Sequence, residues 1–277
     1  MAVDLHTHSN ASDGTDPPAD VITMAADAGL TAIALTDHDG FAGHPEAVEA
    51  AAGRIELVCG VEISTAWGNS PVHLVGYWLG PDSPLGEALV EVRKQRAERN
   101  LRILDALADL DIEITADQLA RVAGQGTAGR PHIASILVER GVVESINQAF
   151  TDYLARGRPA YRERPRMGLA QAIELVHRSG GVCAVAHPHT IADPAVEYSE
   201  FFAEFARLGA DGVETHCADH PPHMRGAMAD KAEAAGLVAT GGSDYHGQNK
   251  PGIAVGTGRG DLAVPDRALD GLRKRLL

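Results

Sequence analysis

Short apolar segments rich in Val, Ile, Leu and Ala alternate with stretches of helical character along most of this 277-residue chain. Such alternation is typical of strand–helix units around a mostly parallel sheet. Strands are expected at residues 2–5, 32–35, 55–59, 72–77, 182–186, 212–215 and 237–240. The length suits one α/β barrel, since such barrels take about 250 residues, but it also suits two smaller domains.

The alternation stops between residues 84 and 166, where only helical patterns occur. Helices are expected there at 85–108, 116–122, 131–140 and 145–155. We therefore predict a helical insertion at 84–166 and a discontinuous barrel built from residues 1–83 and 167–277.

The chain is acidic, with 24 Lys and Arg against 38 Asp and Glu and a formal net charge of −14. This balance argues against a protein that grips long duplex nucleic acid through a broad basic surface. A negatively charged substrate would therefore need local positive charge, from arginines or from metal ions that a residue count does not reveal.

The three cysteines, Cys59, Cys183 and Cys217, lie far apart and show no CxxC spacing, so neither a disulfide framework nor a zinc knuckle is indicated. The first residues lack the order of a secretion signal, and no apolar run approaches the roughly 20 residues of a membrane span. We expect a cytoplasmic protein in a reducing compartment, with no membrane contact and no obligate protein partner.

Histidines and acidic residues gather around the expected strand ends. His6-Thr7-His8 ends the first strand, where alternate residues point to one face, so both imidazoles can reach a common ion. Except for His73, which begins the fourth strand, each of the other positions follows the strand expected to position it. They are Asp13, His38, Glu62, His187, Asp244 and His246. In α/β barrels, active sites assemble at this carboxyl edge of the sheet.

Taken singly, each of these residues has an ordinary explanation. A lone His is usually a core or surface residue, and a lone Asp after a strand is usually a helix cap. Six histidines and three carboxylates at one rim, however, would bury like charges beside unsatisfied imidazoles unless cations held them together. The set therefore predicts a metal cluster.

Six segments carry a family resemblance: HTHSNASDG, TDHDG, GVEIS, HLVGY, AHPH and GSDYHG. In order and spacing they resemble the motifs of the PHP (polymerase and histidinol phosphatase) superfamily of metal-dependent phosphoesterases, across residues 4–77 and 181–247. The resemblance implies a distorted (β/α)7 TIM-like barrel. With its helical insertion, the chain resembles the bacterial subgroup of 3′,5′-nucleoside bisphosphate phosphatases and 5′-3′ oligoribonucleases, in which the insertion would cover the active site.

By this resemblance, three sets of ligands are expected. One ion would take His6, His8, Glu62 and Asp244, a second would share Glu62 and take His73 and His187, and a third would take Asp13, His38 and His246. Imidazole and carboxylate ligands suit Mn²⁺, Fe²⁺ or Zn²⁺. We expect two to three divalent ions, with Mn²⁺ preferred. Three such ions and three carboxylates would leave a charge of about +3 at the site, which would attract a phosphate to an acidic protein.

The reaction implied is hydrolysis of the 3′-phosphate of 3′,5′-bisphosphonucleotides such as pAp, and of short 5′-phosphorylated oligonucleotides, by attack of a metal-bridging hydroxide. Glu62 would take part in catalysis as the bridging ligand. His216, which follows the sixth expected strand, is the candidate acid for the leaving oxygen, with His189 behind it. Orientation of a metal ligand is an equally good role for either.

Arginines crowd the expected insertion at residues 93–102 and 156–166. Such runs usually belong to a solvated face. Arg130 is more specific, because it precedes Pro131 at a helix start, where free amides and the helix dipole favour an anion. We predict that Arg130, with Arg96 or Arg99, binds the other phosphate of the substrate. Tyr161 is expected to stack on a base or to pack against its neighbours.

Three other functions fit parts of the pattern. Histidinol phosphate phosphatase lies within the same superfamily, and the motifs do not separate it. Urease-like amidohydrolases also begin with HxH, but they commonly bridge their metals with a carbamylated Lys, and no Lys ends an expected strand here. A metal-loaded nucleotide-binding domain without turnover would be expected to have lost ligands, whereas all nine positions are filled.

Overall fold

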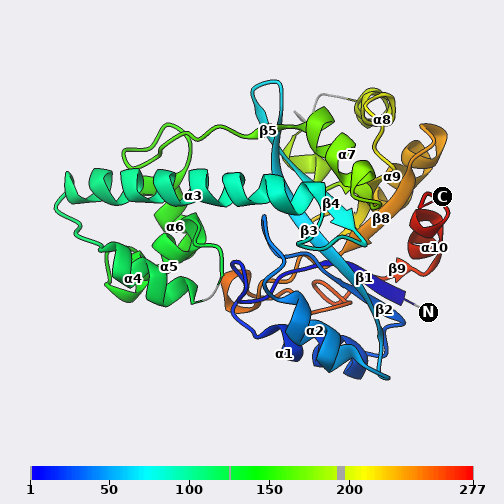
Figure 1. Cartoon of the computed structure of the whole chain (residues 1–277), viewed down its shortest axis with the longest axis horizontal. Coiled ribbons are helices and arrows are strands. Elements are labelled where there is room, and N and C mark those ends of the chain that lie inside the picture. Colours follow the sequence, from blue (N-terminus) through cyan, green and yellow to red (C-terminus); the bar gives the residue numbers. More distant parts are fainter. Residues whose placement is uncertain (1, 125, 192–196, 277) are drawn as a thin grey trace.

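The computed structural model describes residues 2–124, 126–191 and 197–276. One mixed sheet, in the order β8-β7-β6-β4-β3-β2-β1-β9 with β5 beside β3, curls into a nearly closed barrel (Figure 1). Its strands are β1 (Ala2–Thr7), β2 (Ala32–Leu35), β3 (Glu56–Trp67), β4 (Ser70–Tyr77), β5 (Met167–Gly168), β6 (Val182–Val185), β7 (Gly212–Cys217), β8 (Val238–Gly242) and β9 (Val264–Pro265). Seven of these described strands have four or more residues, and the expected TIM-like architecture is confirmed.

The third strand is longer than the sequence suggests, and the fourth runs the opposite way. β3 and β4 form an antiparallel hairpin in which Trp67 pairs with Ser70, and β4 is also antiparallel to β6. Glu62 therefore lies within β3 rather than after it. Because β4 is reversed, the start of that strand, which carries His73, reaches the same edge as the ends of its neighbours. This reversal explains why His73 alone lies near the start of its strand rather than after its end.

The barrel closes between β8 and β1 at the carboxyl edge. The Asp244 N–H donates to the His6 carbonyl oxygen, and the His8 N–H donates to that of Tyr245, both at 2.9 Å. Gly242, the last residue of β8, allows the two backbones to approach each other. A Cβ at this position would lie only 2.4 Å from the backbone nitrogen of His6. The backbone approach that brings His6 and Asp244 together thus needs a residue without a side chain.

We expect Gly242→Ala to destabilise the fold by about 1–3 kcal/mol, because the added methyl group pushes β8 away from β1. Since His6 and Asp244 flank this seam, catalytic activity should fall together with stability. Thermal unfolding and phosphate release measured on the same preparation test this. Gly236→Ala is a poor control because Gly236 has a positive φ, whereas Gly226→Ala adds a methyl group to open space on a helix. Stability equal to that of the Gly226→Ala protein would contradict the expectation.

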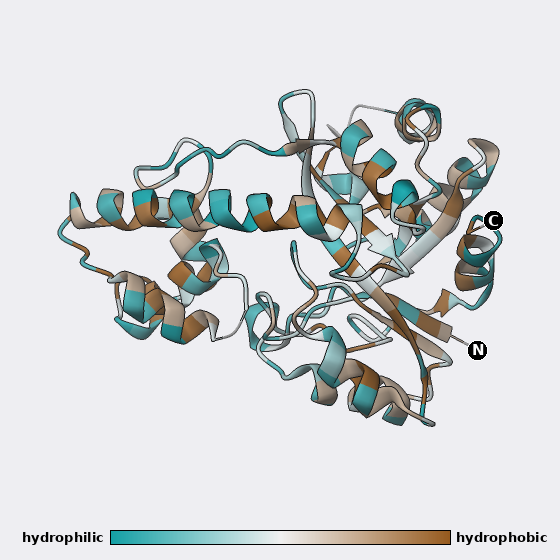
Figure 2. Cartoon of the chain, viewed as in Figure 1, coloured by the Kyte–Doolittle hydropathy of each residue, from teal (hydrophilic) through white to brown (hydrophobic). Residues whose placement is uncertain are grey.

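Helices cover the outside of the barrel. They are α1 (Pro18–Asp27), α2 (His44–Ala51), α7 (Leu169–Arg178), α8 (Tyr198–Arg207), α9 (Pro222–Ala234) and α10 (Arg267–Arg273). Their apolar faces pack on buried strand residues such as Ile33, Leu74 and Val213, which are fully buried. Figure 2 shows hydrophobic stretches in β1 and β2, whereas hydrophilic and hydrophobic residues alternate along α3 on the other side of the molecule. No helix in the described part of the chain combines the length and apolar character needed to cross a membrane.

Residues between β4 and β5 form a helical body that extends to one side of the barrel (Figure 1). It comprises α3 (Pro84–Ala108), α4 (Ala116–Ala123), α5 (Arg130–Glu139), α6 (Ile146–Ala149) and a π-helical turn, η1 (Phe150–Leu154). The first half of α3 packs into the barrel core through Leu85 and Leu89, whereas Ile103 and Leu107 belong to a separate hydrophobic cluster with α5 and η1. A single continuous helix therefore fixes the insertion relative to the barrel.

Candidate metal centre and phosphate pocket

The nine side chains expected to bind metal converge at the carboxyl edge of the barrel. Glu62 from β3 lies at the centre, 1% exposed, with five imidazoles around its carboxylate. One oxygen, Oε1, is 2.7 Å from His73 Nδ1 and 3.1 Å from His187 Nε2. The other, Oε2, is 3.5 Å from His6 Nε2, 3.2 Å from His8 Nε2 and 3.0 Å from His38 Nδ1. The two oxygens thus face different groups of histidines.

Asp13 and Asp244 complete the cluster on either side. Asp244 Oδ1 is 3.6 Å from His6 Nε2 and 3.5 Å from His8 Nε2. Asp13 Oδ2 is 3.6 Å from His38 Nε2, and Asp13 Oδ1 is 3.3 Å from His246 Nε2. Ligand atoms from His8, Asp13, His38 and His246 all lie within 4.8 Å of one another.

Hydrogen bonds fix the orientation of two of the rings. His6 Nδ1 lies 2.7 Å from Glu214 Oε1, and His246 Nδ1 lies 2.9 Å from the carbonyl oxygen of Asp244. Because these oxygens only accept, Nδ1 donates in both rings, and Nε2 of the neutral ring presents a lone pair to the cluster. His6 Nε2 is 3.0 Å from His8 Nε2, a separation that a proton on one of the two nitrogens or a metal ion beside both can satisfy.

The buried polar atoms of the cluster fit divalent ions. Although imidazole and carboxylate atoms lie close by, His38 Nδ1, Glu62 Oε1 and Asp244 Oδ1 are buried and make no well-oriented hydrogen bond with the described residues. Burial lowers the pKa of His246, but Asp13 and Asp244 outweigh it and raise that pKa to about 9. A proton on His246 is therefore stabilised by the two carboxylates, in the place where a metal ion would otherwise balance their charge. Nitrogen and oxygen donors at these spacings fit Mn²⁺, Fe²⁺ or Zn²⁺ equally well.

Glu214 is a residue of this site that the sequence analysis did not identify. It is 1% exposed, and besides binding His6 Nδ1 it accepts a 2.8 Å hydrogen bond from the backbone N–H of His187. One carboxylate therefore positions two candidate ligands from different strands. The signal was present in the sequence, since Glu214 is an acidic residue inside an expected strand, directly after the fully buried Val213.

His216 is not brought to the cluster. Pairing of β7 with β8 shifts register between Glu214 and His216, so that one extra residue in β7 turns His216 away from the side of Glu214. Burial first, then Arg267 and Arg225 from the outer helices, lower the pKa of His216. None of the described contacts joins its ring to the nine candidate ligands, and we do not retain it as the acid. His189 lies nearer, with its ring 6.4 Å from that of His187.

We expect Glu214→Gln to weaken metal binding about 10- to 100-fold, because a neutral amide no longer holds His6 Nδ1–H with a charge-assisted hydrogen bond. Titration of chelator-treated protein with Mn²⁺ measures the effect. Glu200→Gln on the surface of α8 supplies a matched control. An unchanged affinity for Mn²⁺ in Glu214→Gln would show that His6 does not need this partner.

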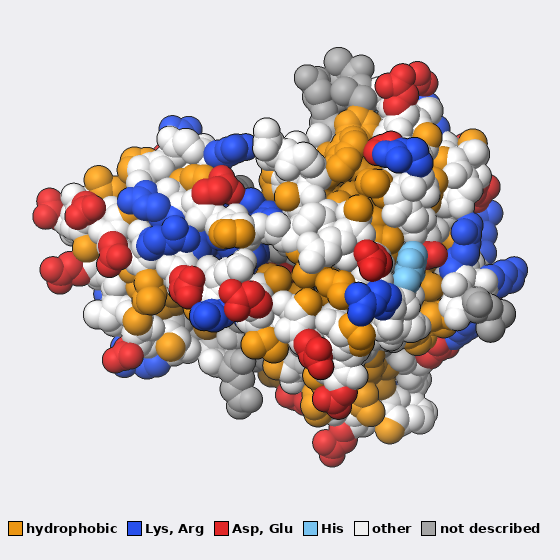
Figure 3. All heavy atoms as spheres, turned by 45° about the horizontal axis from the view of Figure 1, so that its top comes forward, with side chains coloured by type: hydrophobic (Ala, Val, Ile, Leu, Met, Phe, Trp, Pro, Cys, Tyr) orange, Lys and Arg blue, Asp and Glu red, His pale blue; other side chains and the backbone are white. Residues whose placement is uncertain are grey.

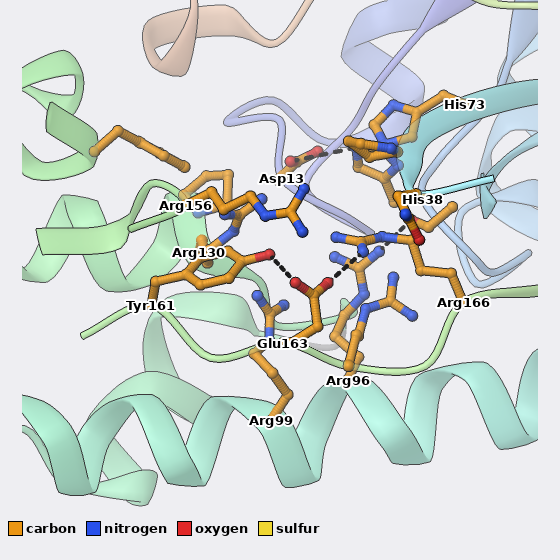
Figure 4. A pocket seen from close by; sticks show the side chains of 16 residues that line it. Asp13, His38, His73, Arg96, Arg99, Arg130, Arg156, Tyr161, Glu163 and Arg166 are labelled. Atoms are coloured by element: carbon orange, nitrogen blue, oxygen red, sulfur yellow. Dashed lines mark hydrogen bonds and ion pairs between the residues drawn. The ribbon is translucent and has the colours of Figure 1, made fainter. Parts of the chain in front are cut away.

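A pocket of about 280 Å³ opens from the metal cluster toward the insertion. Asp13, His38 and His73 line one side, and Tyr161 lies at the other (Figure 4). Six arginines line the space between: Arg96 and Arg99 from α3, Arg130 from α5, and Arg156, Arg164 and Arg166 from the return segment. Figure 3 also shows Lys and Arg side chains gathered on the insertion. The insertion thus brings strong positive charge to an acidic protein beside its metal cluster.

The arginines differ in how they are held. Arg96 donates to the buried carboxylate of Asp39 and, at 2.8 Å, to Ser64 Oγ. Arg130 lies over the rings of Phe150 and Tyr161, at 5.4 and 5.8 Å from their centroids. Arg99 has no acidic partner in the described residues, and burial, followed by Arg96 and Arg130, lowers its pKa to about 8. The pocket therefore holds uncompensated positive charge, which favours an anion.

Sequence comparison identifies the family of this chain. The family model described as "PHP domain" matches residues 4–207. The chain belongs to the PHP domain family. As a member, it is a metal-dependent phosphoesterase. It is 34% identical to the 3′,5′-nucleoside bisphosphate phosphatase of Chromobacterium violaceum over 92% of this chain and 90% of the relative. It is also 34% identical to the 5′-3′ exoribonuclease Rnm of Escherichia coli, over 91% and 87% of the two chains.

Two solved structures match most of this chain. A Bifidobacterium adolescentis protein assigned to the metal-dependent phosphoesterases superposes with a TM-score of 0.87 at 30% identity, covering 99% of this chain and 96% of that one. A C. violaceum protein named as an amidohydrolase, solved with bound sulfate and no metal, gives a TM-score of 0.83 at 33% identity, covering 92% and 90%.

Proposed function

We propose that this PHP enzyme hydrolyses the 3′-phosphate of 3′,5′-bisphosphonucleotides, such as pAp. The observation that carries the proposal is the pocket in which candidate metal ligands and six arginines face each other. Such a pocket has two separate places for phosphate. The reacting phosphate would lie at the metal cluster, and the 5′-phosphate would lie among Arg99, Arg130 and their neighbours.

We propose that the nine clustered side chains hold two to three divalent ions, with Mn²⁺ preferred. When bound, these ions would supply an activated water as nucleophile and would neutralise the phosphate oxygens. In the proposed sets, Glu62 is shared between His73 and His187 on one side and His6, His8 and Asp244 on the other, and Asp13, His38 and His246 form the third set. Distance alone also brings His38 Nδ1 to 3.0 Å from Glu62 Oε2, so the sets adjoin one another.

In the proposed reaction, a water oxygen forms a bond to phosphorus, the bond from phosphorus to the ribose 3′ oxygen breaks, and that oxygen takes up a proton. Arg99 and Arg130 bind the 5′-phosphate and so hold the ribose in place. The hydroxyl of Tyr161 donates to Glu163 at 2.7 Å and Arg130 lies over the ring, so the base would stack on the ring face opposite Arg130.

The same binding mode would serve short oligonucleotides with a 5′-phosphate. Cleavage of the first bond between phosphorus and a 3′ oxygen would release a 5′-mononucleotide and leave a new 5′-phosphate on the remaining chain. One pocket would thus support both a bisphosphonucleotide phosphatase and a 5′-3′ exonuclease, the two activities named for the relatives.

Phosphate release from a panel of substrates tests the proposal. We expect the highest kcat/KM with pAp in the presence of Mn²⁺, lower values with AMP isomers that carry one phosphate, and the lowest with histidinol phosphate, which has no second phosphate for the arginines. Higher turnover of histidinol phosphate than of pAp would overturn the choice of substrate. Tight binding of pAp without hydrolysis in any divalent metal would instead indicate a binding protein.

A further inference from the structure

A second cluster of metal-binding side chains lies beside the first. It contains His189 from the 3-10 turn η2 (Pro188–Thr190), Cys217 at the end of β7, and His220 in the turn that follows. One ligand atom from each residue lies within 4.8 Å of the other two. None of the three belongs to the nine residues described above. We propose that this cluster is a separate binding site for a divalent ion that accepts a thiolate ligand, with Zn²⁺ the ion of matching chemistry.

The local backbone places Cys217 and His220 side by side. The N–H of His220 donates to the carbonyl oxygen of Cys217 at 3.2 Å, which closes a tight turn. The same carbonyl accepts a 3.1 Å hydrogen bond from Arg225 Nε of α9, so the turn is fixed from outside as well. Pairs of ligands separated by two residues recur in zinc sites because such a turn directs both side chains to one point.

A hydrogen bond prepares His220 for an ion. Its Nδ1 donates to the carbonyl oxygen of Thr215 at 3.0 Å, so the lone pair is on Nε2, which faces His189 Nδ1 at 3.0 Å. Two nitrogens bound to one Zn²⁺ at about 2.0–2.1 Å are roughly 3.3 Å apart in tetrahedral geometry. An ion would therefore replace the proton between the two rings with little movement of either.

The chemistry of this cluster differs from that of the nine-residue cluster. Cys217 is 3% exposed and His220 2%, and the cysteine is free of any disulfide. A thiolate favours Zn²⁺ over Mn²⁺, whereas the nine-residue cluster offers only nitrogen and oxygen. Three protein ligands leave a fourth position for water, which the partly exposed His189 makes accessible. The ion would join η2, which directly follows His187, to the turn between β7 and α9.

Titration of chelator-treated protein with Co²⁺ tests the proposal. Cobalt bound to a thiolate gives a strong charge-transfer absorption in the near ultraviolet, which the nine-residue cluster cannot produce because it has no sulfur. Because the nine-residue cluster also takes up Co²⁺ without contributing to this band, we expect the final intensity to correspond to one thiolate-bound Co²⁺ per chain. We also expect the band to be displaced by Zn²⁺ and to be absent in Cys217→Ser. It should remain in Cys59→Ser and Cys183→Ala, which remove the other two cysteines.

His189→Ala gives a second variant that leaves the buried cysteine in place. We expect it to weaken the binding responsible for the band about tenfold or more. Circular dichroism shows whether each metal-free variant is folded. If Cys217→Ser does not fold, the affinity of His189→Ala for Co²⁺ decides whether the proposal holds. Absence of the band in the parent protein at saturating Co²⁺, its persistence in a folded Cys217→Ser, or an unchanged affinity in His189→Ala would each overturn the proposal. Phosphatase activity is not part of the readout, so failure here leaves the proposed function intact.

Discussion

Replacing Glu62 with Gln should lower kcat/KM for phosphate release by about a thousandfold or more. Nitrogen atoms of five histidines lie within 3.5 Å of its two oxygens. An amide of the same size presents only one oxygen, and its NH₂ group faces either the lone pairs or the ions that should bind there. Loss of metal, measured by elemental analysis of the purified variant, should accompany the loss of activity.

The control for this prediction is Glu98→Gln, on the exposed surface of α3. It makes the same chemical change outside the cluster and should keep both activity and metal content. Because Glu62 is a buried carboxylate among histidines, the metal-free variant should also unfold at a different temperature from the metal-free parent. Full activity in Glu62→Gln, with its metals retained, would contradict the shared-ligand role and the grouping of ligands built on it.

The convergence of the nine candidate ligands follows from local sequence patterns. Strand alternation places His6 and His8 on one face, and the carboxyl ends of parallel strands meet at one edge. Strand alternation acts over a few residues, and the edge rule needs only that neighbouring strands run parallel, whereas the reversed β4 that carries His73 depends on its pairing with β3. The arginines that line the phosphate pocket were harder to predict. The guanidinium of Arg164 is buried 3.5 Å from Asp39, but the density of arginines in 156–166 does not show which of them are buried and which are exposed.

Features that depend on long-range pairing were not predictable. The strand expected to end at Cys59 continues as far as Trp67, because residues 60–67 pair with β4. Gly60 permits this pairing, since a Cβ there would lie 2.8 Å from the Gly76 carbonyl oxygen. The β-bulge near Thr215 has no sequence signature, yet it decides that Glu214 and not His216 reaches the cluster. Such details arise from the register between strands, which one sequence does not encode locally.

Substitution of Arg99 by Gln should raise the KM for pAp about 10- to 100-fold, with little change in kcat. A charge-assisted hydrogen bond from a guanidinium to phosphate is worth about 1.5–3 kcal/mol, and each 1.4 kcal/mol changes binding tenfold. Among the described residues Arg99 has no acidic partner to take over its role, and Arg96, Arg130, Arg164 and Arg166 surround it with like charge. Removing it should therefore not lower the thermal stability of the substrate-free enzyme.

Comparison of two substrates separates this role from a general disturbance of the site. The 3′-monophosphate of adenosine lacks the 5′-phosphate that Arg99 is proposed to bind, so its KM should change less than about threefold in Arg99→Gln. Lys94→Gln, on the exposed side of the same helix, should leave both substrates unaffected. Equal losses for pAp and for the 3′-monophosphate would show that Arg99 supports the metal cluster rather than a second phosphate, and the two-phosphate pocket would then be the wrong description of this site.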